Sequence, residues 1–290
     1  MAAPSPRPRR AVVALVVLVV GALAVGGVAW QQTRDDGPQQ VTASLAAPVA
    51  DAPVVEGTWP TTTTTTTTAP SNLDPATGLS VSGPIGPPWP DHFTAADAIV
   101  PNVALYEAPG KPVPTGRTLP NPTVEGYKLV FLVRKQQKDW LQVQINQRPN
   151  GATAWIKASD VAVRTVDNHI LIELGAKKLT VFHGEEPIFT ASVAPGKASS
   201  PTPTGAFYTD ILTRPSNPNG PYGPYQISVT GFSNVYDSFG GGNGQIAIHG
   251  TNRPELIGQP ASHGCVRMNN EDISALIPLA RQGTPVVIVD

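Results

Sequence analysis

Two residues near the end of the chain have the types and spacing needed for thiol chemistry. Cys265, the single cysteine among 290 residues, ends the run Ser262-His263-Gly264-Cys265 and lies sixteen positions after His249. The thiolate is the reactive form of cysteine, and a nearby imidazole can generate it by accepting the proton. An inert buried cysteine is the alternative. A lone thiol in an exported chain has no disulfide partner within it, which favours a chemical role.

Either His249 or His263 is a candidate base for this thiol. His249 is predicted to end a buried strand, Gln245 to His249, and a rigid neighbouring strand can aim an imidazole at the sulfur. His263 shares the turn with Cys265, where a histidine more often shapes the loop, so we prefer His249. Gly264 permits a sharp backbone turn, which would let the amides of Gly264 and Cys265 converge on an oxyanion. These ligand types are too few for a structural zinc site, and we predict neither metal nor cofactor.

The elements that must position these residues are mostly strands. Pro and Gly together contribute 59 residues, whereas charged residues make up only 14%, a composition that favours β-structure and turns. In residues 166–290 we predict seven strands and one helix. The helix would have Asn269 as N-cap and Gly283 as its stop, with a kink or break at Pro278. The predicted strands are His169 to Glu173, Leu179 to Phe182, Ile188 to Val193, Gly205 to Asp210, Gln226 to Val229, Gln245 to His249 and Pro285 to Val289.

A separate small β-domain is predicted for residues 96–165. Its apolar runs are short, the alternation in Leu141 to Ile145 marks a half-buried strand, and Asn150-Gly151 indicates a hairpin. The segment resembles bacterial Src-homology-3-like modules in Trp140-Leu141-Gln142-Val143 and Ala154-Trp155-Ile156-Lys157. This resemblance implies a small β-barrel. The fold class expected overall is mainly β, a barrel-like domain followed by a sandwich-like domain with one C-terminal helix.

The N-terminal third has the composition of an anchor and a spacer. Residues 1–30 combine three arginines with an apolar run, Ala11 to Trp30, long enough to span a membrane. We predict a single-pass anchor at the cell membrane; cleavage after Ala22-Leu23-Ala24 would instead give a secreted protein. Residues 31–95, rich in Pro and containing the run Thr61 to Thr68, are predicted to be a disordered linker. All 21 acidic but only 17 basic residues follow position 30, a formal charge of −4, so no nucleic-acid partner is expected.

The catalytic run is similar to the signature of the L,D-transpeptidase (YkuD-type) domain. The similarity lies in His249-Gly250-Thr251-Asn252, Ile257-Gly258 and Ser262 to Met268, and extends to Thr202-Pro203-Thr204-Gly205. It implies that Cys265 is the nucleophile, that His249 is its base and that the Gly250 backbone holds the imidazole, with Ser262 and His263 in support. Some members carry Ser where Gly250 stands and Asn where Arg267 stands. Arg267 could pair with a substrate carboxylate or with Glu271 or Asp272.

The resemblance implies acyl transfer on peptidoglycan stem peptides, with D-alanine released and third-position residues cross-linked. Hydrolysis of the same acyl-enzyme, an L,D-carboxypeptidase activity, is the nearest alternative. A non-catalytic wall-binding protein and a papain-like endopeptidase are further alternatives, although in the latter family the cysteine precedes the histidine. Tyr222, Tyr225 and Tyr236 either line the cleft or pack loops. The sequence predicts no oligomeric state.

Overall fold

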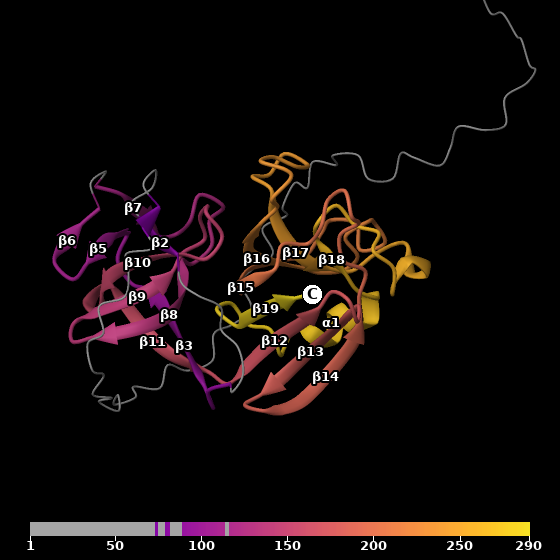
Figure 1. Ribbon diagram of the computed structural model, residues 1–290, viewed down its shortest axis with the longest axis horizontal. Coiled ribbons are helices and arrows are strands. Elements are labelled where there is room, and N and C mark those ends of the chain that lie inside the picture. The colour runs from indigo at the N-terminus through magenta and orange to yellow at the C-terminus, as the bar shows by residue number, and fades with distance from the viewer. Residues whose placement is uncertain (1–72, 75–78, 82–88, 114–115) are drawn as a thin grey trace, which may run out of the picture. The chain divides into compact units, whose positions relative to one another are not determined.

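The computed structural model describes residues 73–74, 79–81, 89–113 and 116–290. The predicted anchor and the threonine run lie outside these residues. Within the described part of the chain, no helix is long and apolar enough to cross a membrane. The part that is described contains two large β-sheets with separate cores and a small two-stranded sheet, and strands far outnumber helices (Figure 1). The mainly β fold class is therefore confirmed.

The first large sheet belongs to the small β-domain. Its strand order is β1-β2-β10-β9-β8-β3-β11, with β5 and β6 attached to β10, and β4 pairs separately with β7. The predicted alternation is confirmed in β9 at Leu141, Gln142 and Val143, but Gln144 is fully buried and donates to the Ala206 carbonyl at 2.7 Å. The bounds are β1 Leu73–Asp74, β2 Leu79–Val81, β3 Phe93–Ala98, β4 Asn102–Ala104, β5 Tyr106–Ala108, β6 Lys111–Pro112, β7 Thr118–Pro120, β8 Val130–Gln137, β9 Trp140–Gln144, β10 Ala152–Lys157 and β11 Val161–Val166, with a 3-10 turn at Ala158–Asp160.

Part of the segment predicted to be a disordered linker is strand. β1 and β2 extend the sheet beyond β10, and β3 begins at Phe93, before the predicted boundary at residue 96. Phe93 and Ala95 are buried together with Val166 and Tyr208. The prediction failed because Leu73 to Val81 has no period of its own, and long-range pairing with an existing strand edge supplies the order.

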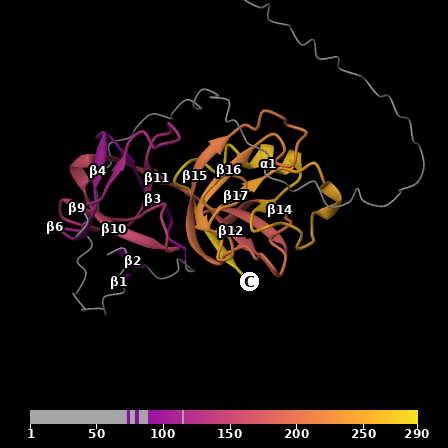
Figure 2. The ribbon, with the colours of Figure 1, turned by 90° about the horizontal axis from the view of Figure 1, so that it is seen from above.

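The second sheet has eight strands in the order β14-β13-β12-β19-β15-β16-β17-β18. Its two halves share one core, which takes residues from β12 and β13 on one side and from β16 and β17 on the other (Figure 2). The register of β15 against β16 shifts between Thr209 and Leu212. The bounds are β12 Asn168–Glu173, β13 Lys178–His183, β14 Glu186–Ser192, β15 Gly205–Thr213, β16 Gln226–Phe232, β17 Gln245–His249, β18 Val266–Arg267 and β19 Pro285–Val289, with a 3-10 turn at Pro254–Leu256.

The C-terminal helix α1, Asn270–Leu276, is shorter than the sequence suggested. Asn269 occupies the N-cap position, but its side chain donates to Asp272 Oδ2 at 3.3 Å and caps no helix amide. The helix ends two residues before Pro278, as expected for a residue without a backbone donor. Gly283 does not stop the helix. It adopts a φ of +88° in a tight turn where a Cβ atom would lie 2.8 Å from that of Ala95.

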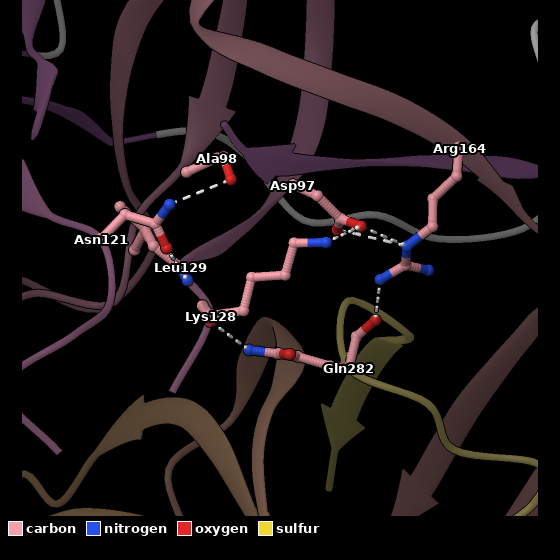
Figure 3. Close-up of polar contacts among 7 residues, drawn as sticks. All are labelled: Asp97, Ala98, Asn121, Lys128, Leu129, Arg164 and Gln282. Atoms are coloured by element: carbon pink, nitrogen blue, oxygen red, sulfur yellow. Dashed lines mark hydrogen bonds and ion pairs between the residues drawn. The ribbon is translucent and has the colours of Figure 1, made fainter. Parts of the chain in front are cut away.

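Polar contacts join the small β-domain to the turn that contains Gly283 (Figure 3). Asp97 on β3 is buried and accepts from Arg164 Nε at 3.2 Å and from Lys128 Nζ at 3.3 Å. The Arg164 guanidinium also donates to the Gln282 carbonyl, and Gln282 Nε2 donates to the Lys128 carbonyl at 2.8 Å. Because the carboxylate has two cationic partners, its burial is compensated. Tyr208 adds a hydrogen bond to the Val130 carbonyl at 3.1 Å, so the two sheets pack directly on one another.

Candidate active site

A parallel strand pair brings the predicted catalytic residues to one place. β17 pairs with β18 so that Ile248 lies opposite Val266 and His249 lies opposite Arg267. Cys265 immediately precedes β18, so the same register places it beside Ala247, two residues before His249. The apolar residues Ile246 and Ile248 bury this strand in the core, which makes it a rigid support for the histidine.

The environment of Cys265 sets its acidity. Removal of the thiol from solvent raises its pKa, while a hydrogen bond from the Ala247 backbone and the positive charge of Arg267 act in the opposite direction. The residue as a whole keeps some exposed surface. The net effect favours the neutral thiol, so formation of the thiolate requires a base at the site.

His249 is almost fully buried, and the backbone of the next residue, Gly250, orients its ring. Nδ1 lies 2.6 Å from the Gly250 carbonyl oxygen. A carbonyl can only accept, so Nδ1 carries the proton and the Nε2 lone pair of the neutral ring is the basic position. The Tyr222 ring packs against the imidazole with centroids 5.0 Å apart. Gly250 has no room for a side chain, because a Cβ atom would lie 2.4 Å from Asn270 Oδ1 and 2.9 Å from the Gly223 Cα.

The Ser262 side chain organises the turn before the thiol. Its hydroxyl donates to the Cys265 carbonyl and accepts from the Gly264 amide at 3.1 Å. Gly264 has a φ of +124°, a conformation that L side chains rarely adopt, yet a Cβ atom there would meet nothing closer than 3.7 Å. The glycine is thus required by the backbone conformation, as predicted from its place in the motif, and crowding plays little part.

His263 has a cationic partner that the sequence analysis did not identify. Its Nε2 lies 3.1 Å from Lys197 Nζ, and since an ammonium group can only donate, this nitrogen is the acceptor. The Lys197 backbone amide also donates to the Ser262 carbonyl at 3.0 Å. Lys197 lies outside the catalytic run, and no local pattern around it signals a role; only the packing of the 194–200 segment against the turn brings it here.

The glycine-rich segment forms a closed loop beside the same turn. Ser233 N donates to the Gly244 carbonyl at 2.8 Å, which brings the two ends of residues 233–244 together. The Phe239 ring lies over His263 with centroids 5.3 Å apart and an interplanar angle of 27°, and Tyr236 packs 5.5 Å from Phe239. Of the tyrosines singled out in the sequence, Tyr222 therefore lies against His249, and Tyr236 lies near His263, with ring centroids 6.4 Å apart. Tyr225 packs against the core and beneath Arg214, with the guanidinium 5.1 Å from the ring centroid.

The remaining predicted residues support the site through backbone and side-chain hydrogen bonds. Arg267 is buried and exchanges two backbone hydrogen bonds with Ala194, each near 3.0 Å. Thr202 Oγ1 accepts from the Gly196 amide at 2.9 Å, and Gly205 begins β15. Within the described ranges, no group of three or more His, Cys, Asp or Glu residues could hold a metal ion.

Comparison with known proteins agrees with this arrangement. A family model of the L,D-transpeptidase catalytic domain, YkuD, matches residues 167–288. The Bacillus subtilis protein named as the L,D-transpeptidase YkuD is 38% identical over 124 residues, 43% of this chain and 67% of that protein. Bacillus subtilis YqjB, also named as an L,D-transpeptidase, is 30% identical over 133 residues, 43% of this chain and 72% of that protein.

Among solved structures, the catalytic domain of the Enterococcus faecium L,D-transpeptidase aligns with 22% identity and a TM-score of 0.32, covering 43% of this chain and 98% of that one. The family assignment rests on the sequence matches. They span the region that contains β12 through β19, and with it His249, the Ser262–Cys265 turn and Arg267. This chain is a member of the L,D-transpeptidase family.

Proposed function

We propose that the protein transfers acyl groups between peptidoglycan stem peptides through a thioester on Cys265. The supporting observation is the pairing of β17 with β18, which brings Cys265 alongside the strand that ends in His249, a histidine whose Nδ1 donates to the Gly250 carbonyl. Because Nδ1 carries the proton of the neutral ring, Nε2 is the basic nitrogen. The corresponding nitrogen of His263 accepts from Lys197, so His249 is the better base for the thiol.

The proposed first step forms the acyl-enzyme. His249 takes the proton of Cys265, and the sulfur attacks the carbonyl carbon of the third, L-centred residue of a tetrapeptide stem. A C–S bond forms and the peptide C–N bond breaks. His249 then returns its proton to the departing D-alanine amine.

The second step transfers the acyl group to an amine on a neighbouring stem. The amine attacks the thioester carbon, its proton passes to His249, and the thiolate leaves. The oxyanion of both steps would lie against the amides of Gly264 and Cys265. Since the Gly264 amide donates to Ser262 Oγ at 3.1 Å, its participation requires the oxyanion to replace that hydroxyl.

A defined disaccharide tetrapeptide, incubated with the purified protein and analysed by mass spectrometry, tests the proposal. We expect an acyl-enzyme that has lost D-alanine, followed by cross-linked dimers. Tripeptide products without dimers would instead establish the L,D-carboxypeptidase activity. Cys265→Ala should keep its melting temperature and form neither product. Cross-links made by folded Cys265→Ala protein would refute the proposal, and failure of the wild-type protein to form an acyl-enzyme would favour a wall-binding role.

The site is proposed to face the cell wall. The apolar run Ala11 to Trp30 would anchor the chain in the cell membrane, and the Thr- and Pro-rich segment after it would carry the catalytic domain outward. Membrane fractionation with N-terminal sequencing tests this placement. An intact N-terminus in the membrane fraction supports an anchor, whereas a mature N-terminus near Ala24 in the soluble fraction supports secretion.

A further inference from the structure

The loop that covers the catalytic turn is a compact unit. We refer to residues 233–244 as the 233–244 loop. Its ends are closed by the Ser233 amide and the Gly244 carbonyl, and its tip by two hydrogen bonds between Phe239 and Gly242. Ser233 Oγ accepts from the amides of Val235 and Tyr236 at 3.1 Å each. These local bonds shape the loop, but none of them determines where it lies relative to the rest of the molecule.

Arg148 of the small β-domain makes that connection. It lies in the turn between β9 and β10, and its guanidinium donates to three carbonyls of the 233–244 loop. Nη1 lies 2.9 Å from Ser233 O, and Nη2 lies 2.9 Å from Tyr236 O and 3.4 Å from Asn243 O. The three carbonyls come from both arms of the loop, so one planar cation holds the arms together.

Asn150, in the same turn as Arg148, fixes the strand that leads into the loop. Its Nδ2 donates to the Phe232 carbonyl and its Oδ1 accepts from the Phe232 amide, both at 2.8 Å. The side-chain amide thus pairs with the end of β16 much as a neighbouring strand would. The Arg148 guanidinium also lies over the Phe232 ring, 5.0 Å from its centroid.

The loop is shaped to receive the arginine. Gly244 has a φ of +78°, and a Cβ atom there would lie 2.9 Å from Arg148 Nη2 and 2.2 Å from the Tyr236 carbonyl oxygen. A side chain at this position would push the loop away from the guanidinium. By contrast, the ion pair with Asp237 spans 3.9 Å and its carboxylate is fully exposed, so it adds little.

We infer that Arg148 and Asn150 are positioning residues that hold the 233–244 loop over the catalytic turn. The loop presents Phe239 to His263, two residues before the nucleophile. Without the guanidinium, Gly240, Gly241 and Gly244 allow the loop many conformations, because glycine has little intrinsic preference. The small β-domain thereby becomes part of the surface that receives the stem peptide. The kinetic consequence rests on the proposed function, whereas the placement of the loop does not.

The test compares Arg148→Ala with Arg164→Ala, both measured in the full chain. Arg164 also joins the small β-domain to the catalytic domain, because its guanidinium, held by Asp97 of its own sheet, donates to the Gln282 carbonyl, but it does not touch the loop. For Arg148→Ala we expect faster amide hydrogen exchange in residues 233–244. Its kcat/KM for acylation by a tetrapeptide stem should fall about tenfold, mainly through KM. Arg164→Ala should lower the melting temperature and leave both loop exchange and KM at wild-type values.

Two additional measurements separate positioning from general damage. Iodoacetamide is too small to depend on the 233–244 loop for binding. Cys265 of Arg148→Ala should therefore be alkylated within about twofold of the wild-type rate. Arg148→Lys keeps the charge without the planar fork and should give an intermediate KM.

Unchanged loop exchange in Arg148→Ala, or equal losses in Arg148→Ala and Arg164→Ala, would overturn the inference. If the loop loosens while the wild-type protein itself forms no acyl-enzyme, the proposed function fails and the placement of the loop by Arg148 stands.

Discussion

His249 and Arg267 lie opposite one another in the parallel pair formed by β17 and β18. One strand therefore ends in the proposed base and the other carries a buried positive charge, and Cys265 directly precedes the second strand. The charge of Arg267 lowers the pKa of this thiol against the opposing effect of burial. The register of two short strands thus places a positive charge that favours ionisation of Cys265, while burial, the larger effect, opposes it.

Removal of this charge should shift thiol reactivity to higher pH. We expect Arg267→Gln to move the midpoint of the pH profile for iodoacetamide labelling of Cys265 upward, because the thiolate loses a stabilising cation. Arg267→Lys should keep the midpoint near the wild-type value. Arg253→Gln is the control, since Arg253 is exposed and pairs with Glu255 at 3.0 Å. An unchanged midpoint in folded Arg267→Gln protein would show that the charge of Arg267 does not lower the pKa of the Cys265 thiol.

Replacement of Gly264 by alanine should damage the catalytic turn through the backbone alone. A φ of +124° is strained for alanine, although a Cβ atom has space there. We expect a loss of about 1–3 kcal/mol in the free energy of unfolding, measured by urea denaturation, with much slower acyl-enzyme formation. Gly184→Ala is the matched control, because Gly184 also has a positive φ, +57°, with nothing within 4 Å. Equal acylation rates for the two variants would argue against a role of the turn.

Asp210 should make the protein less stable as the pH rises. Burial raises the pKa of this carboxyl from 3.8 to about 6, despite hydrogen bonds from Gln245 and Asn146. The unfolded chain therefore loses its proton first, and stability falls between pH 4 and pH 6, by at most about 3 kcal/mol. Asp210→Asn should be more stable than the wild type at pH 7.5 and about equal to it near pH 4. A stability difference between Asp210→Asn and the wild type that is the same at both pH values would refute a role of Asp210 ionisation.

His169 should have the opposite effect in nearly the same range. Its ring is buried among Trp89, Phe93 and Phe182, and burial lowers its pKa from 6.5 to about 4. The unfolded chain gains a proton first, so the contribution of the neutral ring is complete above pH 6.5 and is lost as the pH falls towards 4.

His169→Phe should remove this acid sensitivity, as measured by melting temperature from pH 7.5 down to pH 4.5. His183→Phe, which replaces an exposed ring, should retain it. Because Asp210 and His169 oppose each other, the wild-type curve should be flatter than that of either variant. If His169→Phe and the wild type lose stability in parallel on acidification, the buried ring is not the cause.

The sequence by itself determined the catalytic motif and much of the secondary structure around it. The bounds of β17 and β19 agree with those predicted, because apolar runs bounded by Gly or Pro leave little choice about where a buried strand begins and ends. The need for glycine at position 264 could also be predicted from the sequence, since it is a property of the local backbone.

Tertiary structure decided how these pieces meet. The partner of β17 is a two-residue strand that no periodicity could reveal, and Lys197 reaches His263 from 66 residues away. Arg148 lies 85 residues before Ser233, in another sheet, and its neighbours carry no sign of the loop that it holds. Such contacts join residues that are far apart in the sequence and meet only in the folded chain. The side chains that make them are polar residues in turns, and local sequence patterns cannot predict the partner of such a residue.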